Sequence, residues 1–370
     1  MMMTRKLPFF LALALLAGCQ SGGTKHTAGQ LQVAVNPAIE QGYAAYTKGQ
    51  FDKAIGIYTR AIDAGELSES DLVLAYLRRG SAYKDKGEHD LAINDYTQAL
   101  LIAPDVAEIY NNRGWAYADV GEYELAVMDL NEAVRLAPRF HVAYNNRGLV
   151  QRYMGRYEGA VQDFGSAIEI KPDYVWSYLN RGTVYIDMGE YDKALQDFDR
   201  AIELEPQSAA AYTNRGFAHR MAGDYGEAIA DYNQALRLDP YYDLAFVNRG
   251  VAYRLHGDPP RANKDFDKAL QMKPYYPATY RGRGNAHRDL GQFDSAMQDY
   301  DKAIELNPNE GVSYWDRGVT YERMGRYEQA LADIERALSL DPGYVARLAG
   351  EQIPADSPIR GRVDERLGSL

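Results

Sequence analysis

An asparagine followed by an arginine recurs along the chain at a fixed interval. The motif reads YNNRG at 110–114 and at 144–148, YLNRG at 178–182, YTNRG at 212–216 and FVNRG at 246–250. A carboxamide carries both a donor and an acceptor, so it can bond both polar groups of an extended backbone. A guanidinium is a cation that needs a partner wherever it leaves water. The motif therefore offers one group suited to recognising a peptide and one suited to an ion pair.

The motif belongs to a period of 34 residues. Arginine–glycine pairs stand at 79–80, 113–114, 147–148, 181–182, 215–216, 249–250, 283–284 and 317–318. An alanine follows each glycine after twelve residues, a second alanine seven residues later, and a proline five residues after that. Each unit has two apolar stripes at helical spacing, separated by a glycine such as Gly121 or Gly155 that can end a helix in the left-handed conformation. One helix pair cannot bury its own apolar face, so the period predicts a stacked solenoid.

These positions resemble the tetratricopeptide repeat from about residue 35 to residue 344. Eight units keep the register, and a degenerate copy at roughly 35–70 precedes them. The resemblance implies an all-α, right-handed superhelical solenoid of about nine helix-turn-helix repeats. His219 and His287 take the place of a common tyrosine. They lie roughly 20 Å apart at about 10 Å per stacked helix, so we interpret them as core substitutions and not as metal ligands.

The arginine of the motif falls on the packed side of its helix, together with Tyr144 and Gly148 in the unit that contains Arg147. Sixteen residues after each of the eight arginines stands an aspartate: Asp95, Asp129, Asp163, Asp197, Asp231, Asp265, Asp299 and Asp333. The degenerate first unit lacks both charges. We therefore expect an ion pair between helices in each of the eight units, for example Arg147 with Asp163, Arg181 with Asp197, and Arg215 with Asp231. The spacing leaves open whether each partner belongs to the same unit or to the adjacent one.

The asparagine lies about 100° further round the helix. In tetratricopeptide proteins this side lines the concave wall, and members of the family bind extended peptides through asparagines there. The resemblance carries this role to Asn112, Asn146, Asn180, Asn214 and Asn248. The alternative is that asparagine is merely tolerated at this place and binds nothing.

Cations and aromatic side chains are expected on the same wall. The cations are Lys84, Arg152, Arg220, Arg254 and Arg288, and the aromatic residues are Trp115, Trp176, Phe217 and Trp315. We predict that Arg152, Arg220, Arg254 and Arg288 help to bind a peptide segment with acidic or carboxylate character. The alternative for these arginines is an ordinary solvated helix face.

The N-terminus resembles the signal of a bacterial lipoprotein. MMMTRK supplies positive charge, LPFFLALALLAG supplies an apolar run too short to span a bilayer, and the only cysteine follows. The resemblance implies that residues 1–18 are cleaved, that Cys19 is lipidated, and that residues 19–34 form a flexible tether. Gln20 follows the cysteine where an aspartate could stand, and by the family's sorting rule this favours the outer membrane. We expect the protein to face the periplasm there. The alternative is an ordinary signal peptide.

The charge balance limits the partners. Removing residues 1–18, which hold two basic and no acidic side chains, leaves 39 basic against 52 acidic residues. Such a surface repels nucleic acid and anionic lipid headgroups. We therefore expect the lipid anchor alone, and not charge, to attach the protein to the membrane. We find no phosphate-binding loop, metal spacing or catalytic triad, which predicts neither an enzyme nor a cofactor.

At the C-terminus, residues 345–370 leave the repeat pattern. We expect a short capping helix around 344–349 and a loose tail; without the cap, exposed apolar surface would favour a homodimer. The sequence as a whole predicts a lipid-anchored periplasmic adaptor that binds protein or peptide partners in a concave groove. The alternative is a structural assembly factor for an envelope complex that uses its convex surface or its ends.

Overall fold

The computed structural model describes residues 36–343 and 353–368, and every regular element in them is an α-helix. This confirms the predicted all-α class. Contacts divide the chain into two compact units, the first ending at Leu204 and the second beginning at Glu205. The predicted signal peptide, lipidated Cys19 and tether, and the predicted helix at 344–349, lie outside the described residues.

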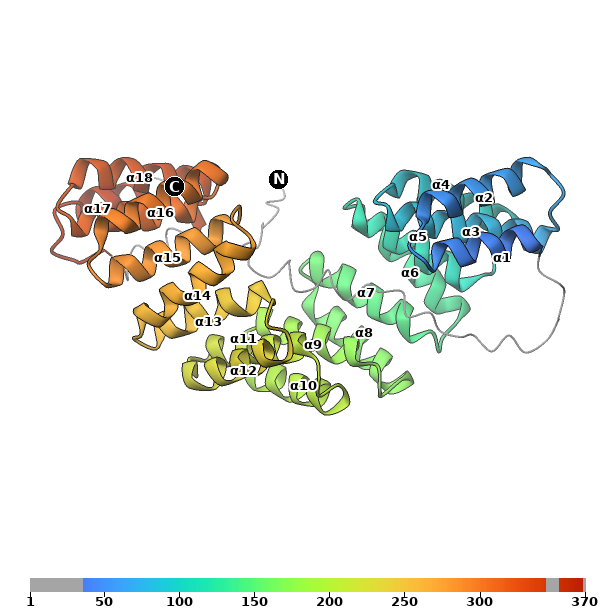
Figure 1. Ribbon diagram of the computed structural model, residues 1–370, viewed down its shortest axis with the longest axis horizontal. Coiled ribbons are helices and arrows are strands. Elements are labelled where there is room, and N and C mark those ends of the chain that lie inside the picture. Colours follow the sequence, from blue (N-terminus) through green and yellow to red (C-terminus); the bar gives the residue numbers. More distant parts are fainter. Residues whose placement is uncertain (1–35, 344–352, 369–370) are drawn as a thin grey trace. The chain divides into compact units, whose positions relative to one another are not determined.

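The described part of unit 1 consists of five helix-turn-helix pairs (Figure 1). Its helices are α1 (Pro37–Tyr46), α2 (Phe51–Asp63), α3 (Glu69–Asp85), α4 (His89–Ile102), α5 (Ala107–Asp119), α6 (Tyr123–Leu136), α7 (His141–Tyr153), α8 (Tyr157–Ile170), α9 (Val175–Asp187) and α10 (Tyr191–Leu204).

The described part of unit 2 contains four further pairs and a terminal helix. Its helices are α11 (Ala209–Ala222), α12 (Tyr225–Leu238), α13 (Asp243–Leu255), α14 (Pro259–Met272), α15 (Pro277–Asp289), α16 (Phe293–Leu306), α17 (Gly311–Arg323), α18 (Tyr327–Leu340) and α20 (Arg360–Gly368). The nine pairs of the two units are the repeats that the period predicts.

A left-handed glycine separates the two helices of a repeat, as the sequence predicts. Gly121 has a φ of 84° and Gly155 a φ of 72°. The backbone N–H of Gly121 donates to the carbonyl of Ala118, and the next N–H donates back to the carbonyl of Tyr117, which closes the end of α5. The chain then reverses and starts the second helix.

The two helices of each repeat pack closely because small residues stand where they meet. A Cβ added to Gly148 would lie 2.9 Å from the Phe164 ring, closer than side chains tolerate. Ala160 and Ala167 on α8 are fully buried. A larger side chain at any of these places would force the helices apart and lose the core contacts.

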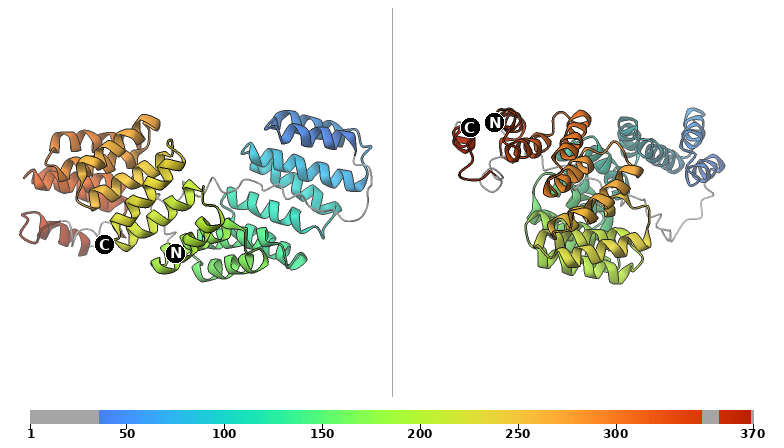
Figure 2. Two further views of the ribbon diagram at one scale, coloured as in Figure 1. Left: turned by 60° about the horizontal axis from the view of Figure 1, so that its bottom comes forward. Right: turned by 60° about the vertical axis from the view of Figure 1, so that its left-hand side comes forward.

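The helices of each unit form two layers, and Figure 2 shows the pairs from two further directions. Within a unit, successive odd-numbered helices pack directly on one another, as α5, α7 and α9 do in unit 1 and α11, α13 and α15 do in unit 2. Within each unit, the even-numbered helices α2 to α8 and α12 to α16 contact mainly the odd-numbered helices before and after them. The odd-numbered layer is therefore the more tightly spaced one, and we call it the inner wall of each unit.

The described C-terminal residues cover the end of the last repeat. Ile353, Ile359 and Val363 are buried against Trp315 and Ile334. The expectation of a loose tail is wrong for residues 353–368, because their apolar side chains gather on one side and bury the exposed end of the solenoid. The expectation that Trp315 projects into the groove is also wrong, because this ring is fully buried in the terminal core.

Candidate functional site

Each repeat arginine donates two hydrogen bonds to the aspartate sixteen residues later. The Nε and Nη2 groups reach the two carboxylate oxygens at 2.5–2.9 Å in Arg79–Asp95, Arg113–Asp129, Arg147–Asp163, Arg181–Asp197, Arg215–Asp231, Arg249–Asp265, Arg283–Asp299 and Arg317–Asp333. In every case the two residues lie on the two helices of one repeat, which answers the question that the spacing left open.

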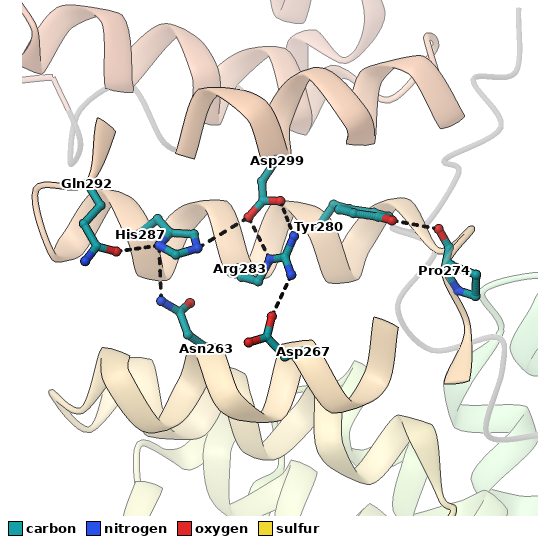
Figure 3. Close-up of polar contacts among 8 residues, drawn as sticks. All are labelled: Asn263, Asp267, Pro274, Tyr280, Arg283, His287, Gln292 and Asp299. Atoms are coloured by element: carbon teal, nitrogen blue, oxygen red, sulfur yellow. Dashed lines mark hydrogen bonds and ion pairs between the residues drawn. The ribbon is translucent and has the colours of Figure 1, made fainter. Parts of the chain in front are cut away.

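The third guanidinium nitrogen of most of these arginines reaches the preceding repeat. Nη1 donates to Thr59 from Arg79, to Thr97 from Arg113, to Asn131 from Arg147, to Asn233 from Arg249, to Asp267 from Arg283 and to Asp301 from Arg317. Figure 3 shows Arg283 between Asp299 of its own repeat and Asp267 of the repeat before. We call this three-helix contact the arginine clamp.

Aromatic rings flank the clamp on its own helix. The guanidinium carbon of Arg113 lies 5.8 Å from the ring centre of Tyr110 and 5.9 Å from that of Tyr117. Rings at this distance stabilise a cation by cation–π attraction. The recurrent tyrosines are thus explained by packing around the clamp.

His287 takes the place of the second tyrosine in its repeat and joins the clamp (Figure 3). Its Nε2 lies 3.9 Å from Asp299, and its Nδ1 lies 2.7 Å from the side-chain oxygen of Gln292. Among the described residues, no group of three His, Cys, Asp or Glu side chains lies close enough together to hold a metal ion.

In each clamp, the attraction between the arginine and the aspartate is opposed by the cost of removing both charges from water. Burial raises the pKa of Asp197 above the ordinary aspartate value, and Arg181 offsets part of this rise. The hydrogen bonds to Asp197 raise the pKa of Arg181 in turn. A buried pair of this kind adds little net stability, but an isolated partner is costly. The clamp therefore specifies how the helices pack and is not a site for a ligand.

The asparagines of unit 1 are used inside the inner wall. Asn146 donates to Asn111 of the preceding repeat at 3.0 Å, and Asn180 donates to Asn145 at 3.1 Å. Ser177 also donates to Asn145, and Asn111 donates to Asn112. These amides connect α5, α7 and α9, so much of their hydrogen-bonding capacity is used to hold successive helices together. Sequence reasoning missed Asn111 and Asn145, although the doubled asparagine of YNNRG marks both.

Two of the arginines expected to line a binding groove are buried and paired. Arg152 is 6% exposed and donates from Nε to Asp187 of the next repeat at 2.6 Å. Arg288 is 8% exposed, with Asp289 at 3.7 Å and Asp316 at 3.6 Å. Since successive inner helices touch, a carboxylate from the same or the next repeat neutralises each cation. The prediction that Arg152 and Arg288 present their charge to a peptide is not supported by this geometry.

Unit 2 has a different arrangement on α11 and α13. Within the described residues, the carboxamides of Asn214 and Asn248 make no hydrogen bond, and no polar atom of either is sealed from solvent. Both helices carry the same kinds of side chain in the same register: Asn214, Phe217, Arg220 and Met221 on α11, and Asn248, Val251, Arg254 and Leu255 on α13. We call these eight residues the α11–α13 wall.

The cations of this wall differ in their partners. Arg220 forms no ion pair in the part of the chain that the structure describes, and its guanidinium lies 4.6 Å from the ring centre of Phe217. Arg254 lies 3.0 Å from Asp289 and remains partly exposed. Met221 and Leu255 are 40% and 38% exposed. Within the described residues, the wall therefore combines two amides without a partner, of which Asn214 is partly exposed and Asn248 is 9% exposed, with one partly buried cation outside any ion pair and two accessible apolar side chains.

Unit 2 also has a small cleft near its C-terminal end. This cleft of about 500 Å³ lies between α18 and α20, but its rim is already paired through Arg362 with Glu328 and Arg366 with Glu335. None of the described helices is long and apolar enough to cross a membrane. The α11–α13 wall remains the best candidate surface.

Family models match more than half of the chain. Models described as tetratricopeptide repeat match residues 107–140, 179–243, 277–310 and 316–344, and one described as TPR repeat matches 80–121 and 151–189. A curated relative, the DnaJ homolog subfamily C member 7 homolog of Schizosaccharomyces pombe, is 42% identical over 65 residues. This match covers 18% of the chain and 13% of the relative.

Solved structures share the fold. The crystal structure of a tetratricopeptide repeat protein from Parabacteroides merdae has a TM-score of 0.56 and 22% identity, covering 67% of this chain and 98% of that one. A chain of the APC/C hetero-tetramer Cut9–Hcn1 has a TM-score of 0.55 and 17% identity, covering 86% of this chain and 76% of that one. The repeat period, the helix pairs and these matches show that the chain belongs to the tetratricopeptide repeat family.

Proposed function

We propose that this protein is an interaction scaffold that binds an extended segment of a partner protein on the α11–α13 wall. The observation that carries the proposal is the pair of equivalent carboxamides, Asn214 and Asn248, which have no partner within the described protein. A polar group of a folded protein normally finds a hydrogen bond, and here that bond is left to water or to a ligand. Because a carboxamide both donates and accepts, the two together suit the backbone of an extended chain.

Charge supports an acidic partner segment. The whole chain carries a net charge of −11 and repels an acidic segment at long range, so such a segment needs a local cation on the wall. Arg220 supplies that cation, and its stacking on Phe217 holds the guanidinium in place without neutralising it. A carboxylate of the partner would complete a charge-assisted hydrogen bond there.

Location forms part of the proposal. The lipoprotein-like N-terminus supports an anchor at Cys19 in the bacterial outer membrane, with the repeats in the periplasm. Each buried methylene contributes about 0.8 kcal/mol, so several acyl chains hold a protein stably at the membrane. In this setting the scaffold would recruit a periplasmic partner to the membrane.

The test uses the full chain as bait for envelope extracts. Replacing both Asn214 and Asn248 with alanine should abolish capture of the partner while the circular dichroism spectrum stays unchanged. The matched control is Asn94→Ala, which removes an exposed carboxamide from α4 outside the inner wall. Retention of the partner by the double variant would refute the proposed site.

A second candidate function rests on the outer helices of unit 1. Leu101 on α4 and Met128 on α6 are 74% and 66% exposed, which is unusual for large apolar side chains. An assembly factor that binds folded partners through its outer surface would use such residues. Leu101→Ser with Met128→Ser would then abolish capture, and the Asn214 and Asn248 variant would not.

A further inference from the structure

The α11–α13 wall repeats its apolar side chains at the spacing of its helices. Met221 and Leu255, the exposed pair, occupy equivalent places on α11 and α13. Phe217 and Val251 are also equivalent, but both are partly buried, and Val251 packs against the core around Phe266. Helices that pack directly on one another lie about 8–10 Å apart, so a ligand that follows the wall meets an equivalent apolar contact at about that interval.

This interval distinguishes between backbone conformations of a bound segment. A polyproline II helix has three residues per turn and rises 3.1 Å per residue, so every third side chain faces the same side, about 9 Å apart. In a β-strand, side chains on one face recur at about 6.7 Å and then at about 13 Å, and neither interval matches. The polyproline II conformation therefore fits the wall better than a strand does.

The free carboxamides argue against a bound α-helix. A helix can also repeat a face at about 10 Å, after seven residues, but its backbone groups are already bonded to one another. The backbone of a polyproline II segment has no internal hydrogen bonds, so its N–H and C=O groups remain available to Asn214 and Asn248. Only such a segment uses both the amides and the apolar places.

Arg220 sets the position of the charged residue. Arg254 already has Asp289 at 3.0 Å, whereas Arg220 has no carboxylate partner in the described structure. A carboxylate of the ligand is therefore expected at the α11 end of the wall and not at the α13 end.

We propose that the partner segment binds in the polyproline II conformation, with an apolar side chain at every third position and a carboxylate at one end. This inference rests on the proposed function of the α11–α13 wall, and it specifies the kind of peptide that the wall recognises.

The experiment measures fluorescence anisotropy of two labelled peptides with the full chain in detergent. The first, DLPSLPSLPS, has leucine at every third position and a terminal aspartate. The second, DLPLSPSLPS, has the same composition with the leucines at intervals of two and four. We expect the first peptide to bind at least about tenfold more tightly, because only it places successive leucines on successive helices.

Variants of the wall test whether it causes the preference for leucine at every third position. Met221→Ser with Leu255→Ser should remove the difference between the peptides, and Leu91→Ser, which changes an exposed leucine on α4, should keep it. Arg220→Gln should weaken the first peptide and leave the spacing preference in place. Equal binding of both peptides, or binding of neither up to about 1 mM, would overturn the inference.

The two levels of the proposal fail separately. If the peptides do not differ but Asn214→Ala with Asn248→Ala still abolishes capture of the natural partner, the wall is a binding site for a segment of another conformation. If the double variant retains that partner, the proposed function itself is wrong.

Discussion

Arg181 and Gly165 face each other at the place where most of the other clamps form a third bond. A Cβ on Gly165 would lie 3.8 Å from Nη1 of Arg181, whereas the equivalent residue for Arg147 is Asn131, which accepts from Nη1 at 2.8 Å. Arg181 therefore has the two bonds to Asp197 and no acceptor on α8. The boundary between α8 and α9 lacks the cross-repeat arm of the clamp.

Gly165→Asn should stabilise unit 1. The substitution supplies the missing acceptor at a place with ordinary space for a Cβ, and it removes a glycine from a helix interior. We expect a gain of about 1 kcal/mol, measured as a higher urea midpoint at unchanged slope. The control is Gly226→Asn on α12, where the only gain is helix propensity; an equal effect of both would contradict the missing arm.

Arg181 and Asp197 should be strongly coupled. Replacing Arg181 with methionine or Asp197 with leucine leaves a buried charge without its partner, and we expect each to cost roughly 3 kcal/mol. The double variant should cost much less than the sum, because no unpaired charge remains. Urea unfolding of all four proteins gives the coupling energy, and additive losses would show that the two charges act independently.

Asn145→Ala should destabilise unit 1 more than Asn214→Ala destabilises unit 2. Asn145 accepts hydrogen bonds from Asn180 and Ser177, so its loss leaves two buried donors unsatisfied, at a cost of about 1–3 kcal/mol. Asn214 bonds nothing within the described protein, so its loss should stay within about 0.5 kcal/mol. Hydrogen exchange measures the loss of protection on α7 to α9 in the Asn145→Ala variant and on α11 to α13 in the Asn214→Ala variant. Equal losses would contradict a structural role for Asn145 that Asn214 lacks.

Tyr58→Phe should stabilise the protein most at alkaline pH. The Tyr58 hydroxyl is buried without a hydrogen-bond partner among the described residues, and burial raises the pKa of Tyr58 to about 12. An unfolded tyrosine ionises near 10, so the native state loses stability as the pH rises from 10 towards 12. The variant removes this loss, and the equivalent Phe164 shows that phenylalanine fits the place. Thermal unfolding at pH 7 and pH 11 tests it: an advantage that does not grow with pH would contradict the assignment.

The fold could be predicted because the period constrains every repeat in the same way. The glycine turns, the close-packed alanines and the arginine–aspartate spacing depend on residues within one unit, and the structure contains all eight pairs. These features are local, so the residues of each repeat determine them, and the period shows that every repeat has the same ones.

The availability of the wall residues could not be predicted in the same way. Whether Asn146 or Asn248 is free depends on the residue that the preceding repeat places against it, which is Asn111 for Asn146. Likewise, Arg152 is neutralised by an aspartate 35 residues later. The repeats resemble one another in sequence, but the side chains of the adjacent repeat determine whether a polar group bonds within the protein or is left for a ligand. The burial of Trp315 by residues 353–363 has the same cause, a contact outside the repeat pattern.

Photo-crosslinking in intact cells tests the central claim most directly. A photoreactive amino acid at position 251 lies on the α11–α13 wall, and one at position 128 lies on the outer layer of unit 1. We expect a partner adduct from position 251 that disappears when Asn214 and Asn248 are alanine, and no adduct from position 128. An adduct from position 128 alone would contradict recognition by the inner wall of unit 2.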